Sequence, residues 1–342
     1  TGNMITGFFT TGIGAGNNNT ITNNSITGLG LSIRAASPVT ATCNWFGTSN
    51  GAAIASIVSP GVNFTPWLIN GTDAEPATIG FQPLAGACNT AQTYYVNDNS
   101  TTGDVFTTAI GNNANLGTAA APFATIQYAV NAVPEGSTIY VDAGTYTEQV
   151  TISRGVILQG AGVGKTIVNG PAGTLTVMPE FHETGIIQSL LNISNVTVDG
   201  ITVDGTLSAE QHAVFIQGGG KVSNSELRNV NNGVYFRSVN GAPLIAESIN
   251  NHMHGISYVG LLSFSDNMDL RMYNNVIDLN GAIFGMGVIV GGTGLKLTAL
   301  NNQIINHNGF GFSLDASEVV IQNNSITAIA GKSIANGRAD ML

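Results

Sequence analysis

The stretch Phe123–Gly170 decides the fold and reads FATIQYAVNAVPEGSTIYVDAGTYTEQVTISRGVILQGAGVGKTIVNG. Its first eleven positions place apolar residues at helical spacing, and the Pro-Glu-Gly of residues 134–136 ends that helix. The pattern then changes to short apolar runs separated by glycines, which is typical of short strands. A stack of such strands exposes an apolar cross-section and pairing edges unless something covers its end. The stretch therefore predicts a short capping helix near residues 123–133, followed by the first turns of a coiled sheet.

Composition favours the same class of fold along the whole chain. Of its 342 residues only 9% are charged, whereas 43% are hydrophobic and 44 residues are glycine. Ordinary globular domains carry about 25% charged residues, and disordered chains are rich in charge and poor in Val, Ile and Phe. In a solenoid, side chains stack in rows at strand spacing, where like charges would repel one another. The composition therefore indicates an all-β solenoid.

Charge and cysteine content narrow the setting. The net charge of −10, with ten Lys plus Arg, argues against nucleic acid, anionic membranes and polyanionic substrates as partners. No apolar run approaches the roughly 20 residues that span a bilayer, so no membrane insertion is expected. Cys43 and Cys88 suit an oxidising, extracellular or cell-surface setting if they form a disulfide, and two buried free thiols are the alternative.

Pairs of asparagines recur along the second half of the chain. They begin at residues 231, 250, 274, 301 and 323, at steps of 19, 24, 27 and 22 residues. Such a loose period is a repeat signal. Asparagine tolerates left-handed backbone geometry in turns, and stacked asparagine side chains can hydrogen-bond along a column. The pattern predicts a turn ladder formed by Asn232, Asn251, Asn275, Asn302 and Asn324.

Four phrases carry a resemblance to a known fold: Pro122–Gln127, Ile139–Val141, Gly144–Tyr146 and Leu158–Gly160. They resemble the opening of the right-handed parallel β-helix, the pectate-lyase-like fold, found in repeat regions of large secreted bacterial cell-surface proteins. This resemblance implies that residues 1–50 are the final turns of one β-helix and 51–93 its closing segment and linker. Residues 94–137 are then an opening segment with the capping helix, and 138–342 the turns of a second β-helix. Trp45 and Trp67 would cap the last turn of the first β-helix with large apolar area.

Neither end of the chain shows a boundary of this fold. Thr1–Asn3 begins in the middle of a pattern and shows no signal peptide, and Asp340–Leu342 stops without a closing segment. Placing Leu342 before Thr1 continues the pattern, with Met341-Leu342 running into Met4-Ile5. We therefore expect about one period of a tandem array or head-to-tail filament, whose partners are copies of itself joined end to end. The helix near 123–133 is expected to contact residues 36–90.

Two motifs have spacings found in ligand-binding sites. Gly160–Thr166 looks like a phosphate loop, but Gln159 stands where the motif requires glycine, so a turn is expected. His252-Met253-His254 places two imidazoles on one face of a strand, which suits a metal. Glu247, Asp266 and Asp269 are the candidate third ligands, and solvent-facing or hydrogen-bonded histidines at a turn are the alternative.

Carboxylates provide the remaining candidates. The pairs Asp199 with Asp204 and Asp266 with Asp269 could serve glycoside hydrolysis, although Asp-Gly is also an ordinary turn signal. The loop with Asp98, Asn99 and Asp104 could hold Ca²⁺ through oxygen ligands, or it is a polar loop. Turns and polar loops are the favoured interpretation of all these patterns. The sequence therefore predicts no catalytic residue, no metal ligand set and no cofactor other than Ca²⁺.

The function expected from these observations is an extracellular structural or adhesive β-helix segment of a tandem-repeat surface protein or filament. Exposed Asn and Thr rows, or the loops near 172–190 and 206–212, could bind surface glycans. The first alternative is a carbohydrate-active enzyme, a glycan hydrolase or lyase of the same fold. The resemblance implies that a lyase needs a calcium cluster beside a basic group, and Arg228, Arg237 and Arg271 are the arginines on expected turns. The second alternative is a carbohydrate-binding module.

Overall fold

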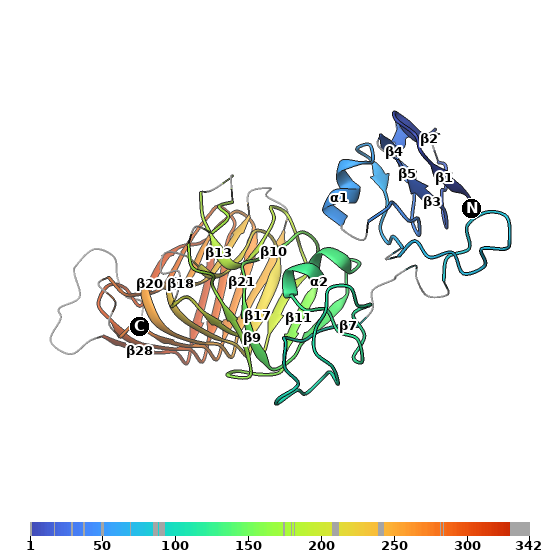
Figure 1. Ribbon diagram of the computed structural model, residues 1–342. Helices are drawn as coiled ribbons and strands as arrows, with labels where there is room; N and C mark the ends of the chain where they lie inside the picture. The colour runs from blue at the N-terminus through green and yellow to red at the C-terminus, as the bar shows by residue number, and fades with distance from the viewer. Residues whose placement is uncertain are drawn as a thin grey trace. The chain divides into compact units, whose positions relative to one another are not determined.

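The computed structural model of the chain contains two compact units (Figure 1). One comprises Thr1–Thr93 and Tyr128–Ser137, the other Tyr94–Gln127 and Thr138–Leu342. No helix in the described part of the chain is long and apolar enough to cross a membrane. The structure describes all residues except 1, 17, 29, 37, 49–50, 69, 85–87, 89–92, 174, 179, 181, 207–211, 239–242, 281, 283 and 329–342.

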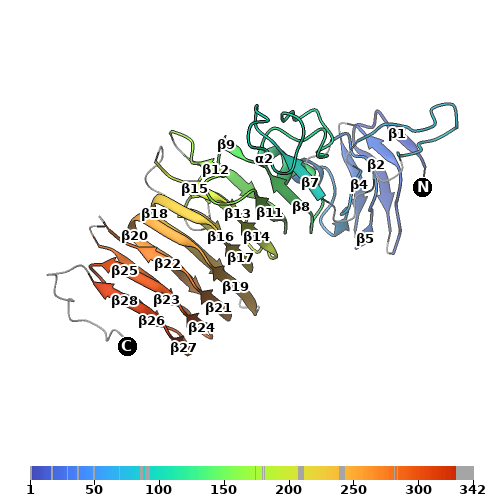
Figure 2. The same ribbon diagram turned by 90° about the horizontal axis from the view of Figure 1, so that it is seen from below.

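The larger unit is a parallel β-solenoid in which successive turns stack side by side (Figures 1 and 2). Strand pairing divides it into three columns, and a full turn gives one strand to each. Column 1 is a nine-stranded sheet made, in chain order, of β7 (Thr93–Val96), β8 (Thr138–Val141), β11 (Ile157–Gly160), β14 (Val196–Asp199), β17 (Gly220–Ser223), β19 (Leu244–Ile249), β21 (Met268–Tyr273), β24 (Lys296–Leu300) and β27 (Glu318–Gln322).

Columns 2 and 3 share two long strands, β18 (Glu226–Ser238) and β20 (His252–Ser265), which run through both. A register shift between Val230 and Asn232 marks the place where these strands pass from one column to the next. Column 2 also holds β9 (Gly144–Thr147), β12 (Thr166–Asn169), β15 (Thr202–Asp204), β22 (Val276–Asp278), β25 (Gln303–His307) and β28 (Ser325–Ala328). Column 3 also holds β10 (Val150–Ile152), β13 (Gly185–Ser189), β16 (His212–Ile216), β23 (Met286–Gly291) and β26 (Phe312–Asp315).

Alternation of side chains explains why these short segments become strands of a closed stack. In β21 every second residue is buried, and the residues between them face outward. Ala246, Leu270 and Leu297 lie in register on three successive strands of column 1 and are all buried. Burial of each leucine side chain stabilises the fold by about 1.5–3 kcal/mol. The predicted all-β parallel β-helix is therefore confirmed.

A short helix, α2 (Ile126–Ala132), lies within the predicted range of 123–133. It begins later than the apolar spacing indicated, because Phe123 pairs with Val96 in an isolated bridge. The carboxylate of Glu148 accepts the backbone N–H groups of Ile126 and Gln127, both at 2.9 Å. Burial raises the pKa of Glu148, and these hydrogen bonds partly oppose that rise.

The recurring asparagine pairs form the corner between columns 1 and 2, and the two members of a pair have different tasks. The first members at this corner, such as Asn250 and Asn274, have left-handed backbones with φ of 55° and 56°. The second members Asn251, Asn275 and Asn302 are buried, whereas Asn324 is partly exposed. The amide oxygen of each of these four accepts the backbone N–H of the equivalent residue one turn earlier. The ladder runs from Ser225 through Asn251, Asn275 and Asn302 to Asn324, with N···O distances of 3.0, 3.1, 2.9 and 2.8 Å.

Asn232 was predicted to belong to this ladder, and that prediction is wrong. It lies inside β18, in register with His212 and Val259, and its amide oxygen accepts the backbone N–H of Val259 at 3.2 Å. Because β18 continues from column 2 into column 3, the pair Asn231-Asn232 falls away from the corner between columns 1 and 2. Ser225 takes the first place in the ladder instead.

The smaller unit repeats the same architecture over fewer turns. Its strands pair in parallel, β1 with β3, β2 with β4 and β5 with β6. Asn24 and Asn44 form a short ladder of their own, in which the N–H of Asn24 donates to the amide oxygen of Asn44 at 3.0 Å. The elements of this unit are β1 (Met4–Thr6), β2 (Thr11–Ala15), β3 (Ser25–Thr27), β4 (Leu31–Ala35), β5 (Val39–Thr40), α1 (Gly51–Ser56) and β6 (Val62–Asn63).

Both tryptophans lie in this smaller unit. Trp67 is buried in its core beside Phe64, with ring centroids 5.8 Å apart. Trp45 is half-buried and packs against Leu68 and Phe81. Cys43 and Cys88 form a disulfide in the same unit. The role of Trp45 and Trp67 in capping the last turn stays a prediction. So does the contact of residues 123–133 with residues 36–90. The expected join of Met341-Leu342 to the N-terminus falls on residues outside the described part.

Removal of this disulfide should destabilise the smaller unit selectively. The bond closes a loop with a sequence separation of 45 residues, and closing a loop of this length stabilises a fold by about 4 kcal/mol. Serine at both Cys43 and Cys88 should therefore lower the urea midpoint of this unit. Tryptophan fluorescence measures it directly, because both tryptophans of the chain are there. A reductant should lower the urea midpoint of the wild type and leave that of the double variant unchanged. Equal urea midpoints of the oxidised wild type and the double variant would contradict the expectation.

Candidate functional site

A groove of about 560 Å³ crosses the C-terminal ends of four neighbouring strands of column 3. These strands are β18, β20, β23 and β26, which pair in parallel in that order. Each strand adds its own side chains to the groove, at the strand spacing of about 4.8 Å. Its lining residues are Arg237, Ser238, Phe264, Ser265, Asp266, Ile289, Val290, Gly291, Gly292, Ser313, Leu314 and Asp315.

The groove combines one exposed aromatic ring with charged and hydroxyl side chains. Phe264 is 47% exposed and lies in register between Arg237 and Gly291 on the neighbouring strands. Gly291 leaves room for this ring, since a Cβ atom there would lie 3.2 Å from the Phe264 Cδ1 atom. Asp266 and Asp315 add two carboxylates to the lining. An aromatic face with a few polar groups around it is typical of a small-molecule or sugar site.

Next to the groove, the outer face of column 3 is covered by residues that precede β13. Met178 packs there into an apolar cluster with Phe215, Tyr235, Val259 and Leu262. The rings of Phe215 and Tyr235 stack with centroids 4.8 Å apart. The predicted loop 172–190 is shorter than expected, because Gly185–Ser189 forms β13. Ile289 packs against this cluster and also lines the groove, so the two are adjacent.

One ion pair and one hydrogen bond hold polar side chains beside this apolar cluster. Glu183 contacts the imidazole of His212 at 3.1 Å, and His212 is 2% exposed. The hydrogen bond from His212 lowers the pKa of Glu183. Arg237 donates to the Tyr235 hydroxyl at 3.0 Å. Burial raises the pKa of Tyr235, although Arg237 opposes that rise, so this phenol stays protonated at neutral pH.

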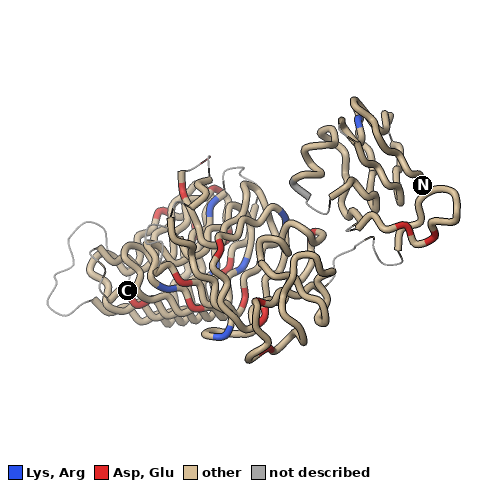
Figure 3. Tube along the Cα trace, in the orientation of Figure 1, with Lys and Arg blue, Asp and Glu red and all other residues tan. Residues whose placement is uncertain are grey.

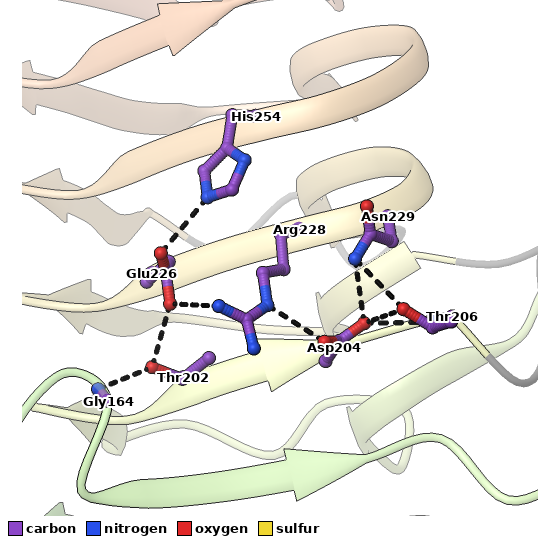
Figure 4. Close-up of polar contacts among 8 residues, drawn as sticks. All are labelled: Gly164, Thr202, Asp204, Thr206, Glu226, Arg228, Asn229 and His254. Atoms are coloured by element: carbon purple, nitrogen blue, oxygen red, sulfur yellow. Dashed lines mark hydrogen bonds and ion pairs between the residues drawn. The ribbon is translucent and has the colours of Figure 1, made fainter.

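A second cluster of polar side chains lies on the outer face of column 2 (Figure 4). Arg228 bridges two carboxylates, donating to Asp204 at 2.8 Å and to Glu226 at 3.0 Å. Glu226 also contacts His254 at 3.0 Å and accepts the Thr202 hydroxyl at 3.0 Å. The strand pairing explains the cluster, because Thr202, Glu226 and His252 lie in register, as do Asp204, Arg228 and His254.

These contacts keep both carboxylates of the cluster ionised. Burial alone would raise the pKa of Asp204, but hydrogen bonds from Thr206, Asn229 and Arg228 outweigh it and lower the pKa to about 2. Burial of Glu226 is likewise outweighed, by contacts with His254, Thr202 and Arg228, so its pKa is lowered. A general acid in glycoside hydrolysis needs a raised pKa. Asp204 is therefore unsuited to the acid role considered from the sequence.

The structure separates both carboxylate pairs considered from the sequence. Asp199 lies in column 1 and accepts hydrogen bonds from Gln159, Ser223 and Asn224, whereas Asp204 lies in column 2. Asp269 lies in column 1 beside Arg271, which also contacts Glu247. Asp266 instead lines the groove of column 3 and accepts the backbone N–H of Thr293 at 2.8 Å. Neither pair forms a hydrolytic site.

The third metal ligand suggested from the sequence is also wrong. Glu247 and Asp269 lie in column 1, and Asp266 lines the groove, so none of the three joins the histidines. Glu226 does, because its strand pairs with β20 and places it opposite His252. The ligand atoms of Glu226, His252 and His254 all lie within 4.8 Å of one another. Among the described residues these three form the group that could hold a metal ion.

The loop considered for Ca²⁺ is tied by internal hydrogen bonds. Asp98 accepts the N–H of Ser100 at 2.7 Å, and Asp104 accepts from the Asn97 amide at 2.8 Å. Asn99 is exposed. Burial and the carboxylate of Asp142 raise the pKa of Asp104, against hydrogen bonds that lower it. Calcium binding here stays a prediction.

The glycine-rich stretch at 160–166 is a turn between β11 and β12, as the sequence indicated. The N–H of Gly164 donates to the Thr202 hydroxyl at 2.9 Å, and the Thr166 hydroxyl donates to the carbonyl of Val141 at 2.9 Å. These contacts satisfy the hydrogen-bonding groups of the turn within the solenoid.

Charged residues are few over the chain and do not gather into one block (Figure 3).

Sequence reasoning missed three residues of the candidate sites: Phe264, Asp315 and Glu226. A signal for Glu226 was present, since it stands two residues before Arg228 just as His252 stands two before His254. That matching spacing indicates equal positions on neighbouring turns. No comparable signal marks Asp315, whose position depends on the number of residues in each loop of the turn.

Comparison with known proteins adds little to these observations. No protein-family model matches the chain, and no curated protein matches it. Among solved structures, the A-module of a mannuronan C-5 epimerase from Azotobacter vinelandii matches with a TM-score of 0.30 and 15% identity. The match covers 61% of this chain and 93% of that one. A likeness this weak carries no argument about activity, and the fold assignment rests on the strand pairing described above.

Proposed function

We propose that this chain is an extracellular β-helix segment that binds a neutral glycan in the groove of column 3, and so acts as an adhesive segment. The observation that carries the proposal is the exposed ring of Phe264 inside a groove that crosses four turns. Sugar rings pack their C–H faces against aromatic rings, while their hydroxyls hydrogen-bond to carboxylates, guanidinium groups and serines.

The charge of the groove indicates which glycans fit. Asp266 and Asp315 contribute two carboxylates and Arg237 one guanidinium group, and the whole chain carries a net charge of −10. Uronate polymers would be repelled by this surface. Neutral glycans are therefore the expected ligands.

Replacing the aromatic ring should weaken glycan binding. Phe264→Ala is expected to lower the affinity for the best neutral oligosaccharide about tenfold, because a lost aromatic contact costs about 1.4 kcal/mol. Binding is measured by calorimetry after screening a panel of neutral and uronate glycans. Binding of uronate polymers alone, or absence of binding by every neutral glycan, would contradict the proposal.

The matched control lies in a second groove of about 480 Å³ on column 1, whose lining includes Lys221, Ile245 and Glu247 but no aromatic residue. Ile245 is 51% exposed, close to the 47% of Phe264. Ile245→Ala should leave glycan affinity unchanged. If it abolished binding while Phe264→Ala did not, the groove on column 1 would be the binding site.

A carbohydrate-active enzyme is the second candidate, because Asp266 and Asp315 both line the groove. Two carboxyl groups that face a bound sugar chain are what glycoside hydrolysis requires. An enzyme would release shorter products, and Asp266→Asn and Asp315→Asn would stop that release while binding persists. Binding without any product over the same panel favours the adhesive role.

A further inference from the structure

We infer that Glu226, His252 and His254 form a binding site for a divalent transition-metal ion of the zinc type, on the outer face of column 2. The inference does not depend on glycan binding, because these residues lie on another column than the groove. Two imidazoles and one carboxylate are a ligand set that suits Zn²⁺ and leaves a fourth position open to solvent. Ca²⁺ and Mg²⁺ prefer oxygen ligands alone, and imidazole ligands select against them.

Register and spacing bring the three ligands together without any special loop. Glu226 pairs with His252 on the next strand, and His254 follows two positions later on the same face. The two imidazole rings lie with centroids 4.7 Å apart and an interplanar angle of 35°. The nitrogen and oxygen atoms that would bind the ion lie within 4.8 Å of one another.

The contact between Glu226 and His254 already has nearly the separation that a shared ion requires. Their Oε1 and Nε2 atoms are 3.0 Å apart. Two ligand atoms bound to zinc at about 2.0–2.1 Å in tetrahedral geometry are about 3.3 Å apart. A small rotation of either side chain would therefore admit the ion. His252 is exposed, which leaves its ring free to turn toward the same point.

The second oxygen of Glu226 is held by residues that would orient the carboxylate. Arg228 and Thr202 both donate to Oε2, at 3.0 Å each, and leave Oε1 directed at His254. Asp204 in turn fixes Arg228 at 2.8 Å. Such outer contacts on a ligand are what position it for a metal, and their loss weakens binding about 10- to 100-fold. Figure 4 shows this arrangement around Glu226.

The turns on either side support a cation at this place. Asp278 lies in register with His254 on the following strand, and Val276 lies in register with His252. Asp278 and Asp204 thus place carboxylates on both sides of the ligand turns, and Arg228 is already bound to acidic partners. The surface around the three ligands is therefore net negative, which favours a divalent cation.

The test is metal titration of the untagged, EDTA-treated protein at pH 7.5. Zn²⁺ should bind with one-to-one stoichiometry by calorimetry, and Co²⁺ in its place should give the intense visible absorption of a low-coordination site. Excess Ca²⁺ should not compete. Each of His252→Ala, His254→Ala and Glu226→Gln should weaken Zn²⁺ binding at least tenfold.

The matched control is His182→Ala, which removes an exposed histidine elsewhere on the chain. It should leave the Zn²⁺ affinity unchanged. Far-UV circular dichroism and the urea midpoint of each variant show whether it is folded; His252 is exposed, so its alanine variant keeps the test informative. Absence of one-to-one binding by the folded wild type, or binding that survives all three ligand substitutions, would overturn the inference.

Discussion

Asp142→Ala should lower the free energy of unfolding of the larger unit by about 5 kcal/mol, more than any other single change considered for this chain. Asp142 is buried, and its carboxylate accepts the backbone N–H groups of Val105, Phe106 and Thr107 at 2.6, 2.9 and 2.7 Å. It also accepts the Thr107 hydroxyl and the N–H of Ala143, both at 2.8 Å. Each buried donor left without an acceptor costs about 1–3 kcal/mol.

The chain contains its own control for this measurement. Urea unfolding followed by far-UV circular dichroism reports both units and mainly the larger one, which has most of the strands. Fluorescence of Trp45 and Trp67 reports the smaller unit alone, which should be unaffected. Asp269→Ala is the matched variant, since that carboxylate is partly exposed and contacts Arg271. Exposed pairs of this kind contribute about 0–1 kcal/mol. Equal losses in the Asp142 and Asp269 variants would contradict the structural role assigned to Asp142.

Stability should also depend on pH through Asp142. Burial would raise the pKa of this carboxyl, but the hydrogen bonds outweigh it, so the folded pKa lies below the usual range. The unfolded state therefore binds more protons in acid, and stability falls as pH drops. The contribution is complete above the unfolded pKa of about 3.9 and is lost as pH falls through the folded pKa. The difference between wild type and Asp142→Asn should thus shrink below about pH 4; a constant difference would contradict it.

Asn275→Ala should lower the free energy of unfolding of the larger unit by about 4 kcal/mol. The amide of Asn275 donates to Ser248 and Asn302 at 2.8 and 2.9 Å, and its oxygen accepts the N–H of Asn251 at 3.1 Å. Alanine leaves that buried N–H without an acceptor and interrupts the ladder. Buried donors without partners cost about 1–3 kcal/mol each, and the lost side-chain volume adds a cavity.

The neighbouring Asn274 provides the control for the ladder. It is exposed, has φ of 56° and donates to the Asn250 side chain at 3.0 Å. Asn274→Gly keeps the left-handed backbone and removes one exposed hydrogen bond, so it should cost less than about 1 kcal/mol. Urea unfolding by circular dichroism compares the two. A larger loss at Asn274 than at Asn275 would show that backbone geometry, and not the stacked amides, stabilises this corner.

The sequence contained enough to predict the solenoid and the short helix α2. Glycine-separated apolar runs after Pro134 identified short stacked strands, and the paired asparagines marked the repeated corner. One asparagine pair does not lie at this corner, because Asn231-Asn232 lies inside the long strand β18. Nothing local in the sequence indicates that β18 passes from column 2 to column 3 without a break, so its asparagines looked like the others.

The candidate sites were less predictable because they depend on register between turns. His252 and His254 were recognised by their alternate spacing, whereas Glu226 joins them across 26 residues. Register over that distance is set by the length of every intervening loop. The same holds for Phe264 and Asp315, which reach one groove only because β20, β23 and β26 stack in parallel.

The asparagine corner has a consequence for how such a chain can change. Each turn contributes one residue to the ladder, and the hydrogen-bond distances along it are nearly uniform. The turns that contain Asn251, Asn275 and Asn302 nevertheless differ in length by several residues. The surplus residues are accommodated in loops away from this corner. Backbone stacking and loop length are therefore independent, so new surfaces can be inserted into one turn without altering the alignment of the turns above and below it.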